Sequence, residues 1–89
     1  MQTSSEALVA LPAGVDLHAR PAANFVRTAL GFSANLTVAS GEREADAKSL
    51  LAILALGAKR GTTLRLTADG EDAGAALDAL CGCIAGLTE

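Results

Sequence analysis

His18 is the only histidine of this 89-residue chain, and it lies in the run Leu-His-Ala-Arg-Pro-Ala at residues 17–22. Neutral imidazole is a nucleophile that can attack phosphorus, and its near-neutral pKa leaves it unprotonated often enough to react. The guanidinium of Arg20 can form planar, charge-assisted hydrogen bonds with phosphoryl oxygens. These residue types at this spacing indicate a site that holds a phosphoryl group.

A proline predicts where this site lies in the fold. Pro21 is tolerated in the first turn of a helix because the N–H groups there have no intrahelical partner. We therefore expect His18 just before a helix N-terminus, where the free N–H groups of Ala19 and Arg20 and the macrodipole favour an anion. Taken alone, His18 is better explained as a residue that satisfies a local hydrogen bond, Arg20 as a solvated side chain and Pro21 as an ordinary first-turn proline.

Length and composition indicate one small domain over residues 1–89 with an aliphatic core, because Phe25 and Phe32 are the only aromatic residues. The net charge of −3 argues against binding to nucleic acid. No apolar run is long enough to span a bilayer, and the first residues lack the pattern of a signal peptide. We therefore expect a cytoplasmic protein that does not bind membranes.

Patterns of apolar residues predict seven elements. Strands are expected at residues 6–11, 34–40, 42–47 and 62–68, and helices at 19–30, between the N-cap Ser49 and the stop at Gly57, and at 71–87 with acidic residues in the first turn. Clean alternation along 62–68 implies one covered and one solvated face. The order β-α-β-β-α-β-α thus predicts an α+β fold in which three helices cover one face of a four-stranded antiparallel sheet.

Cys81 and Cys83 are the only cysteines. Positions two apart on a helix point to different faces, and one distant histidine makes a poor zinc set. Two reduced cysteines beside the core are the favoured interpretation, and a redox or metal role is the alternative.

Two segments carry a family resemblance. Residues 17–23 resemble the phosphorylation-site signature of HPr, the histidine-containing phosphocarrier of the bacterial phosphoenolpyruvate:sugar phosphotransferase system. Residues 46–51 (Asp-Ala-Lys-Ser-Leu-Leu), followed by Leu56 and Gly57, resemble the regulatory-serine segment of that family. The resemblance covers essentially the whole chain, and the predicted order of elements is the open-faced β-sandwich of the family.

The resemblance implies a stoichiometric carrier rather than an enzyme, with no cofactor and no metal. His18 would be phosphorylated at Nδ1 by enzyme I, with phosphoenolpyruvate as the ultimate donor, and would pass the group to IIA components. Arg20 would contact the phosphoryl group during transfer. We expect a monomer whose docking patch comprises Ala23, Arg27, Leu50, Leu51 and Leu54.

Ser49 has two compatible interpretations. As an N-cap it stabilises the short helix. As the regulatory serine of the family it would be a substrate of an HPr kinase/phosphorylase. A phosphate there would add negative charge to the docking patch and oppose an acidic partner.

Two acidic residues depart from the family pattern. Asp16 stands where the family usually has glycine, and Asp46 stands where it usually has asparagine. Asp tolerates left-handed backbone better than most residues, so Asp16 can replace the glycine conformationally. Its charge is expected to raise the pKa of His18 and to oppose an arriving phosphoryl group.

Two other functions remain as alternatives. One is a regulatory HPr paralogue that acts through protein binding and Ser49. The other is an acylphosphatase-like hydrolase, which the lack of a glycine-rich phosphate loop disfavours. The sugar or regulatory pathway is not indicated by the sequence.

Overall fold

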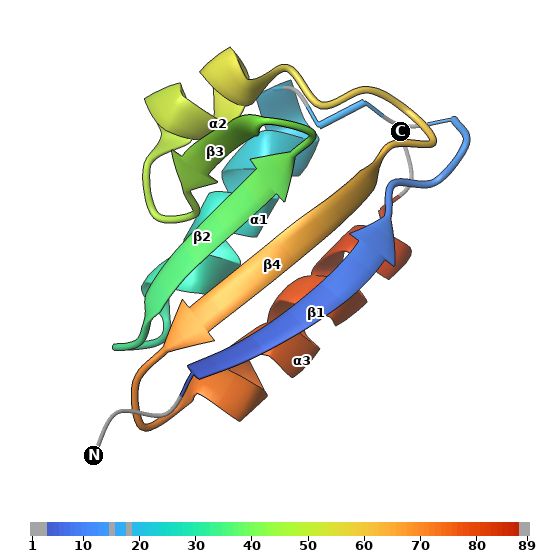
Figure 1. Cartoon of the computed structure of the whole chain (residues 1–89). Coiled ribbons are helices and arrows are strands. Elements are labelled where there is room, and N and C mark those ends of the chain that lie inside the picture. The colour runs from blue at the N-terminus through green and yellow to red at the C-terminus, as the bar shows by residue number, and fades with distance from the viewer. Residues whose placement is uncertain (1–3, 15, 18, 88–89) are drawn as a thin grey trace.

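The computed structural model describes residues 4–14, 16–17 and 19–87, and it contains seven helices and strands. Their bounds are β1 (Ser4–Ala10), α1 (Ala19–Leu30), β2 (Asn35–Ser40), β3 (Arg43–Asp46), α2 (Leu50–Leu56), β4 (Thr63–Asp69) and α3 (Ala73–Ala85). The predicted order β-α-β-β-α-β-α is confirmed (Figure 1).

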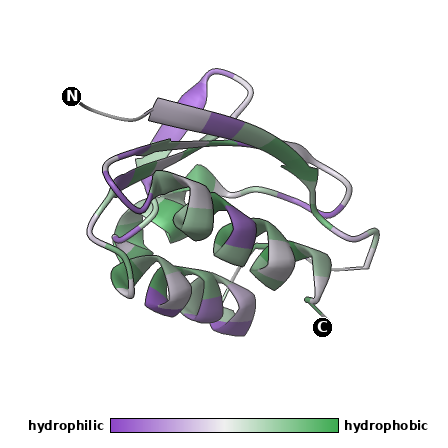
Figure 2. Ribbon diagram, turned by 90° about the horizontal axis from the view of Figure 1, so that it is seen from below, coloured by the Kyte–Doolittle hydropathy of each residue, from purple (hydrophilic) through white to green (hydrophobic). Residues whose placement is uncertain are grey.

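The four strands form one antiparallel sheet in the order β1-β4-β2-β3. β4 lies in the interior, paired with β1 on one side and with β2 on the other, so β1 and β3 are the edge strands. Figure 2 shows the sheet as one layer, with the helices together on one side of it. The predicted open-faced sandwich is confirmed.

The core lies between the sheet and the helices, and the apolar faces of both layers supply it. Leu64, Leu66 and Ala68 of β4 are fully buried and alternate with outward-facing residues. The helices contribute their buried residues, which are Ala22, Phe25, Val26 and Ala29 in α1 and Ala73, Ala76, Leu77, Leu80 and Ile84 in α3. The alternating pattern of the strand and the three- to four-residue spacing of the helices therefore place their buried residues in one core, which is aliphatic apart from Phe25.

The prediction of acidic residues in the first turn of the last helix is wrong. α3 begins at Ala73, and its N-cap residue, Asp72, makes no side-chain bond to its own helix. Instead, the Asp72 carboxylate accepts hydrogen bonds from the backbone N–H groups of Ser33 and Ala34, both at 2.9 Å. These hydrogen bonds, chiefly the one from the Ser33 backbone, hold the pKa of Asp72 below its usual value. Asp72 thus joins the start of α3 to the loop before β2.

Gly70 makes a second close contact at this junction. Its φ is 148°, and a Cβ built on it would lie 2.8 Å from the Cα of Ala34, closer than real contacts. Glycine therefore lets the turn after β4 approach the backbone before β2.

The remaining differences are at element ends. β1 spans residues 4–10 rather than 6–11, although the N–H of Leu11 still bonds to the carbonyl of Thr62 at 2.9 Å. α3 stops at Ala85 rather than at residue 87, because Gly86 forms its C-cap. Over the described ranges, no helix has the length and apolarity that a membrane crossing requires.

Candidate functional site

The segment that leads into α1 is attached to the loop before β4. The Leu11 carbonyl accepts the N–H of Gly61 at 3.2 Å, and the Leu17 N–H donates to the carbonyl of Ala58 at 2.9 Å. The Leu17 side chain is 1% exposed, so it anchors the chain in the core immediately before position 18. His18 itself lies outside the described residues.

Asp16 supplies another link between the same two segments. Its Oδ1 accepts the backbone N–H of Arg60 at 2.7 Å and the Nε–H of the Arg60 guanidinium at 3.3 Å. The hydrogen bond from the Arg60 backbone, and to a smaller extent the bond from its side chain, holds the pKa of Asp16 below its usual value. The predicted effect of Asp16 on the pKa of His18 stays a prediction, but this carboxylate already has a cationic partner.

The start of α1 is conformationally unusual. Ala19, its first residue, has a φ of 45°, which is left-handed and uncommon for a residue with a Cβ. Such a conformation typically costs about 1–3 kcal/mol and persists where the surrounding structure enforces it. Pro21 lies in the first turn of α1, as predicted, and Arg20 beside it is exposed. The N–H groups of this turn lack intrahelical acceptors and are available to an anion.

The outward face of α1 carries two of the predicted docking residues. Ala23 is half-buried, and Arg27 is exposed, with Nη1–H donating to Oδ1 of Asn24 at 3.3 Å. Leu30, at the end of the helix, has 61% of its surface exposed and was missed by the sequence interpretation. Its spacing of seven from Ala23 and three from Arg27 places it on the same helix face, which is the signal that could have identified it.

α2 carries the other docking candidates. Leu50 and Leu51 are 41% and 81% exposed, respectively, and Leu54 is half-buried. α2 has Ile53 and Leu56 as its buried residues and packs against α1 and β3. The predicted residues therefore belong to two adjacent helices, and Leu50 and Leu51 leave apolar surface exposed.

Both predicted ends of α2 are confirmed. Ser49 is the N-cap, and its Oγ accepts the N–H of Ala52 at 3.2 Å. Gly57 is the C-cap in the left-handed conformation. The turn before the helix depends on Asp46, whose Oδ1 accepts the N–H of Lys48 at 2.9 Å. An asparagine has the same acceptor, so Asp46 can fill that structural role with an added charge.

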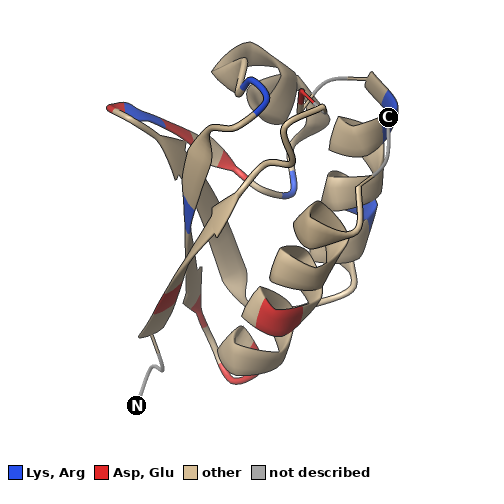
Figure 3. Cartoon of the chain, turned by 90° about the vertical axis from the view of Figure 1, so that its right-hand side faces the viewer, with Lys and Arg blue, Asp and Glu red and all other residues tan. Residues whose placement is uncertain are grey.

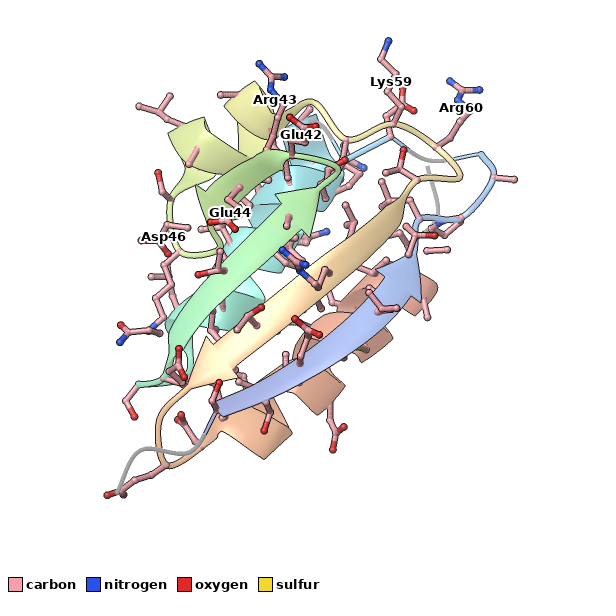
Figure 4. All side chains as sticks on the ribbon, viewed as in Figure 1. Glu42, Arg43, Glu44, Asp46, Lys59 and Arg60 are labelled. Carbon is pink, nitrogen blue, oxygen red and sulfur yellow. The ribbon has the colours of Figure 1, made fainter. Side chains whose placement is uncertain are left out.

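Charged side chains are distributed unevenly. Figure 3 shows that the helical layer carries few acidic or basic residues. Arg43, Lys59 and Arg60 lie at one end of the molecule, together with the acidic Glu42 (Figure 4), and Arg60 is paired there with Asp16.

The cysteines are free and half-buried. Burial, with a smaller contribution from Asp78, raises the pKa of the Cys81 thiol, which disfavours the reactive thiolate. Among the residues that the structure describes, no group of three or more His, Cys, Asp and Glu side chains could hold a metal ion.

Comparisons with known proteins agree on one family. The family described as "PTS HPr component phosphorylation site" matches residues 4–85. The chain is 47% identical over 68 residues to phosphocarrier protein HPr of Haemophilus influenzae, covering 76% of this chain and 80% of that protein. The crystal structure of HPr-C-His from Thermoanaerobacter tengcongensis superposes with a TM-score of 0.87 at 37% identity, covering 91% of each chain.

A longer relative also contains this unit. The multiphosphoryl transfer protein of Xanthomonas campestris is 45% identical over 80 residues, which cover 90% of this chain but only 9% of that protein. The match over residues 4–85 and the shared fold establish that the chain belongs to the HPr family of phosphocarriers of the phosphotransferase system.

Proposed function

We propose that the chain accepts a phosphoryl group on Nδ1 of His18 from phosphorylated enzyme I and passes it to IIA components. The observation that carries this proposal is that Ala19, Arg20 and Pro21 form the first turn of α1, directly after His18 in the sequence and within the matched region. Residues 17 and 19, on either side of His18, belong to a buried anchor and a helix N-terminus, respectively.

The proposed step needs no group beyond this chain and its partner. The Nδ1 lone pair attacks phosphorus, and the bond from phosphorus to the donor breaks with its electron pair kept by the donor. Arg20 and the N–H groups at the start of α1 then stabilise the negative charge on the phosphoryl oxygens. Because phosphoryl transfer depends mainly on positioning and electrostatics, a small exposed site is sufficient.

We propose Ala23, Arg27, Leu50, Leu51 and Leu54 as the docking patch, extended by Leu30. Exposed apolar surface on adjacent helices supports this proposal, because such surface is typical of protein contacts. The positive charge of Arg27 would complement acidic residues of a partner.

Leu51→Glu is expected to raise the KM for phosphorylated enzyme I roughly tenfold, with little change in kcat, because the apolar contact that Leu51 would make with enzyme I is lost. The measurement is the initial rate of phosphoryl transfer at varied enzyme I concentration. Leu8→Glu is the matched control, since Leu8 is 69% exposed on β1, outside the two docking helices. Equal KM values for the two variants would contradict the docking assignment.

Ser49 is proposed as a phosphorylation site only for a kinase that can reach a half-buried hydroxyl. Its Oγ already caps α2, and a phosphate would keep acceptor oxygens at that helix N-terminus. The added charge would then repel an acidic partner rather than unfold the helix. The cytoplasmic location, the monomeric state and the absence of nucleic-acid or membrane binding remain predictions.

Incubation with enzyme I and phosphoenolpyruvate tests the proposed function. The purified chain is expected to gain one phosphoryl mass that is lost in acid and retained in alkali, as an N–P bond requires. Peptide mapping should place it on residue 18. A chain that gains no phosphate, or that instead hydrolyses acyl phosphates with many turnovers, would overturn the carrier assignment.

A further inference from the structure

The hydrogen bonds next to the start of α1 include one made by a side chain, that of Asp16. We infer that Asp16 is a positioning residue: its carboxylate accepts a hydrogen bond from the backbone N–H of Arg60, and this bond, here called the Asp16 clasp, fixes the segment that leads to the phosphoryl acceptor. This inference rests on the proposed function. Its physical basis is a hydrogen bond of 2.7 Å across 44 residues of sequence.

The clasp acts together with its neighbour along the chain. The Leu17 N–H bonds to the Ala58 carbonyl at 2.9 Å, and the Asp16 carboxylate bonds to the Arg60 N–H. One bond alone would hold the segment at a point about which it can turn. Two consecutive bonds to the same loop fix both its position and its direction just before residue 18.

A strained residue follows directly. Ala19 is held at a φ of 45°, a conformation that relaxes unless the chain on both sides is restrained. On the C-terminal side the restraint is α1, whose residues Ala22 and Phe25 are fully buried. On the N-terminal side it is Leu17 and the Asp16 clasp. In the sequence, position 18 is the one residue between these two restrained segments.

The two hydrogen bonds of Asp16 differ in what they contribute. The Arg60 guanidinium and the Asp16 carboxylate are 64% and 42% exposed, respectively, and exposed ion pairs contribute little to stability. The backbone N–H does not depend on the side chain of residue 60. Its hydrogen bond to Asp16 is the shorter of the two, and this bond is also the main cause of the lowered pKa of Asp16. The positioning effect should therefore survive loss of the guanidinium but not loss of the carboxyl oxygen.

Three substitutions separate these contributions. Asp16→Ala removes the acceptor and the charge, Asp16→Asn keeps an acceptor oxygen without the charge, and Arg60→Ala keeps the backbone donor without the guanidinium. The control is Asp78→Ala, which removes one exposed acidic side chain from α3. The kcat and KM for phosphorylation by enzyme I are measured on each full-length chain.

Asp16→Ala is expected to lower kcat roughly tenfold with an unchanged KM, because misplacement of a reacting group affects the transfer step rather than docking. Asp16→Asn and Arg60→Ala should stay within about threefold of the parent chain, since each keeps the backbone clasp. In parallel, amide hydrogen exchange of Arg60 should accelerate in Asp16→Ala only. This second readout does not require phosphorylation.

Two outcomes would overturn the inference. Asp16→Ala with the kcat of the parent chain would show that the clasp does not position the site. Equal losses in Asp16→Ala and Asp16→Asn would assign the effect to charge instead. Failure of the parent chain to accept phosphate would instead refute the proposed function, and the exchange rate of the Arg60 amide would still report whether the clasp exists.

Discussion

His18→Ala is expected to abolish phosphorylation by enzyme I and phosphoenolpyruvate while leaving the fold intact. It removes the only imidazole of the chain, and no other nitrogen nucleophile precedes α1 between residues 4 and 17. Removal of the nucleophile itself eliminates the transfer rather than slowing it. The measurement is incorporation of acid-labile phosphate, followed by intact mass over a time in which the parent chain reaches completion.

Arg20→Ala and Asp78→Ala are the companion variants. Loss of Arg20 is expected to slow phosphorylation about 10²-fold without abolishing it, because one charge-assisted contact to the phosphoryl oxygens disappears. Asp78→Ala should behave as the parent chain, since its exposed carboxylate lies on α3. An acid-labile phosphate that persists in His18→Ala would place the acceptor elsewhere and refute the assignment.

The fold could be predicted because its determinants are local. Alternation along β4 and the three- and four-residue spacing along α1 each specify a buried face, and the structure buries those faces. Ser49 and Gly57 could be recognised as helix ends because capping depends on the residue type and its near neighbours. The β-α-β-β-α-β-α order then leaves few ways to cover one face of a sheet.

Contacts between distant segments could not be predicted in this way. Asp72 looked like a first-turn acid, but it binds Ser33 and Ala34, 39 and 38 residues away. Asp16 looked like a substitute for glycine, and nothing local shows that it binds Arg60. In both cases a carboxylate satisfies backbone donors of another loop, and this pairing follows only once the sheet has brought the loops together.

Phe25→Ala is expected to be the most destabilising single change in the core. Phe25 is the largest fully buried side chain, with 0% of its surface exposed, and it lies on the inner face of α1. Truncation of a buried phenylalanine costs about 3–5 kcal/mol through lost transfer free energy and the cavity that remains. A domain of this kind is stable by only about 5–15 kcal/mol, so the variant should lose a large fraction of its free energy of unfolding.

Urea unfolding measures this loss as a lower midpoint at an unchanged slope. Phe32→Ala is the matched control, because Phe32 is the other aromatic residue but is only half-buried at the edge of the core. Its backbone carbonyl, which accepts Lys48 Nζ at 2.7 Å, is kept in the variant. A smaller loss in Phe32→Ala than in Phe25→Ala is therefore expected. Equal losses would show that the inner face of α1 does not dominate the core.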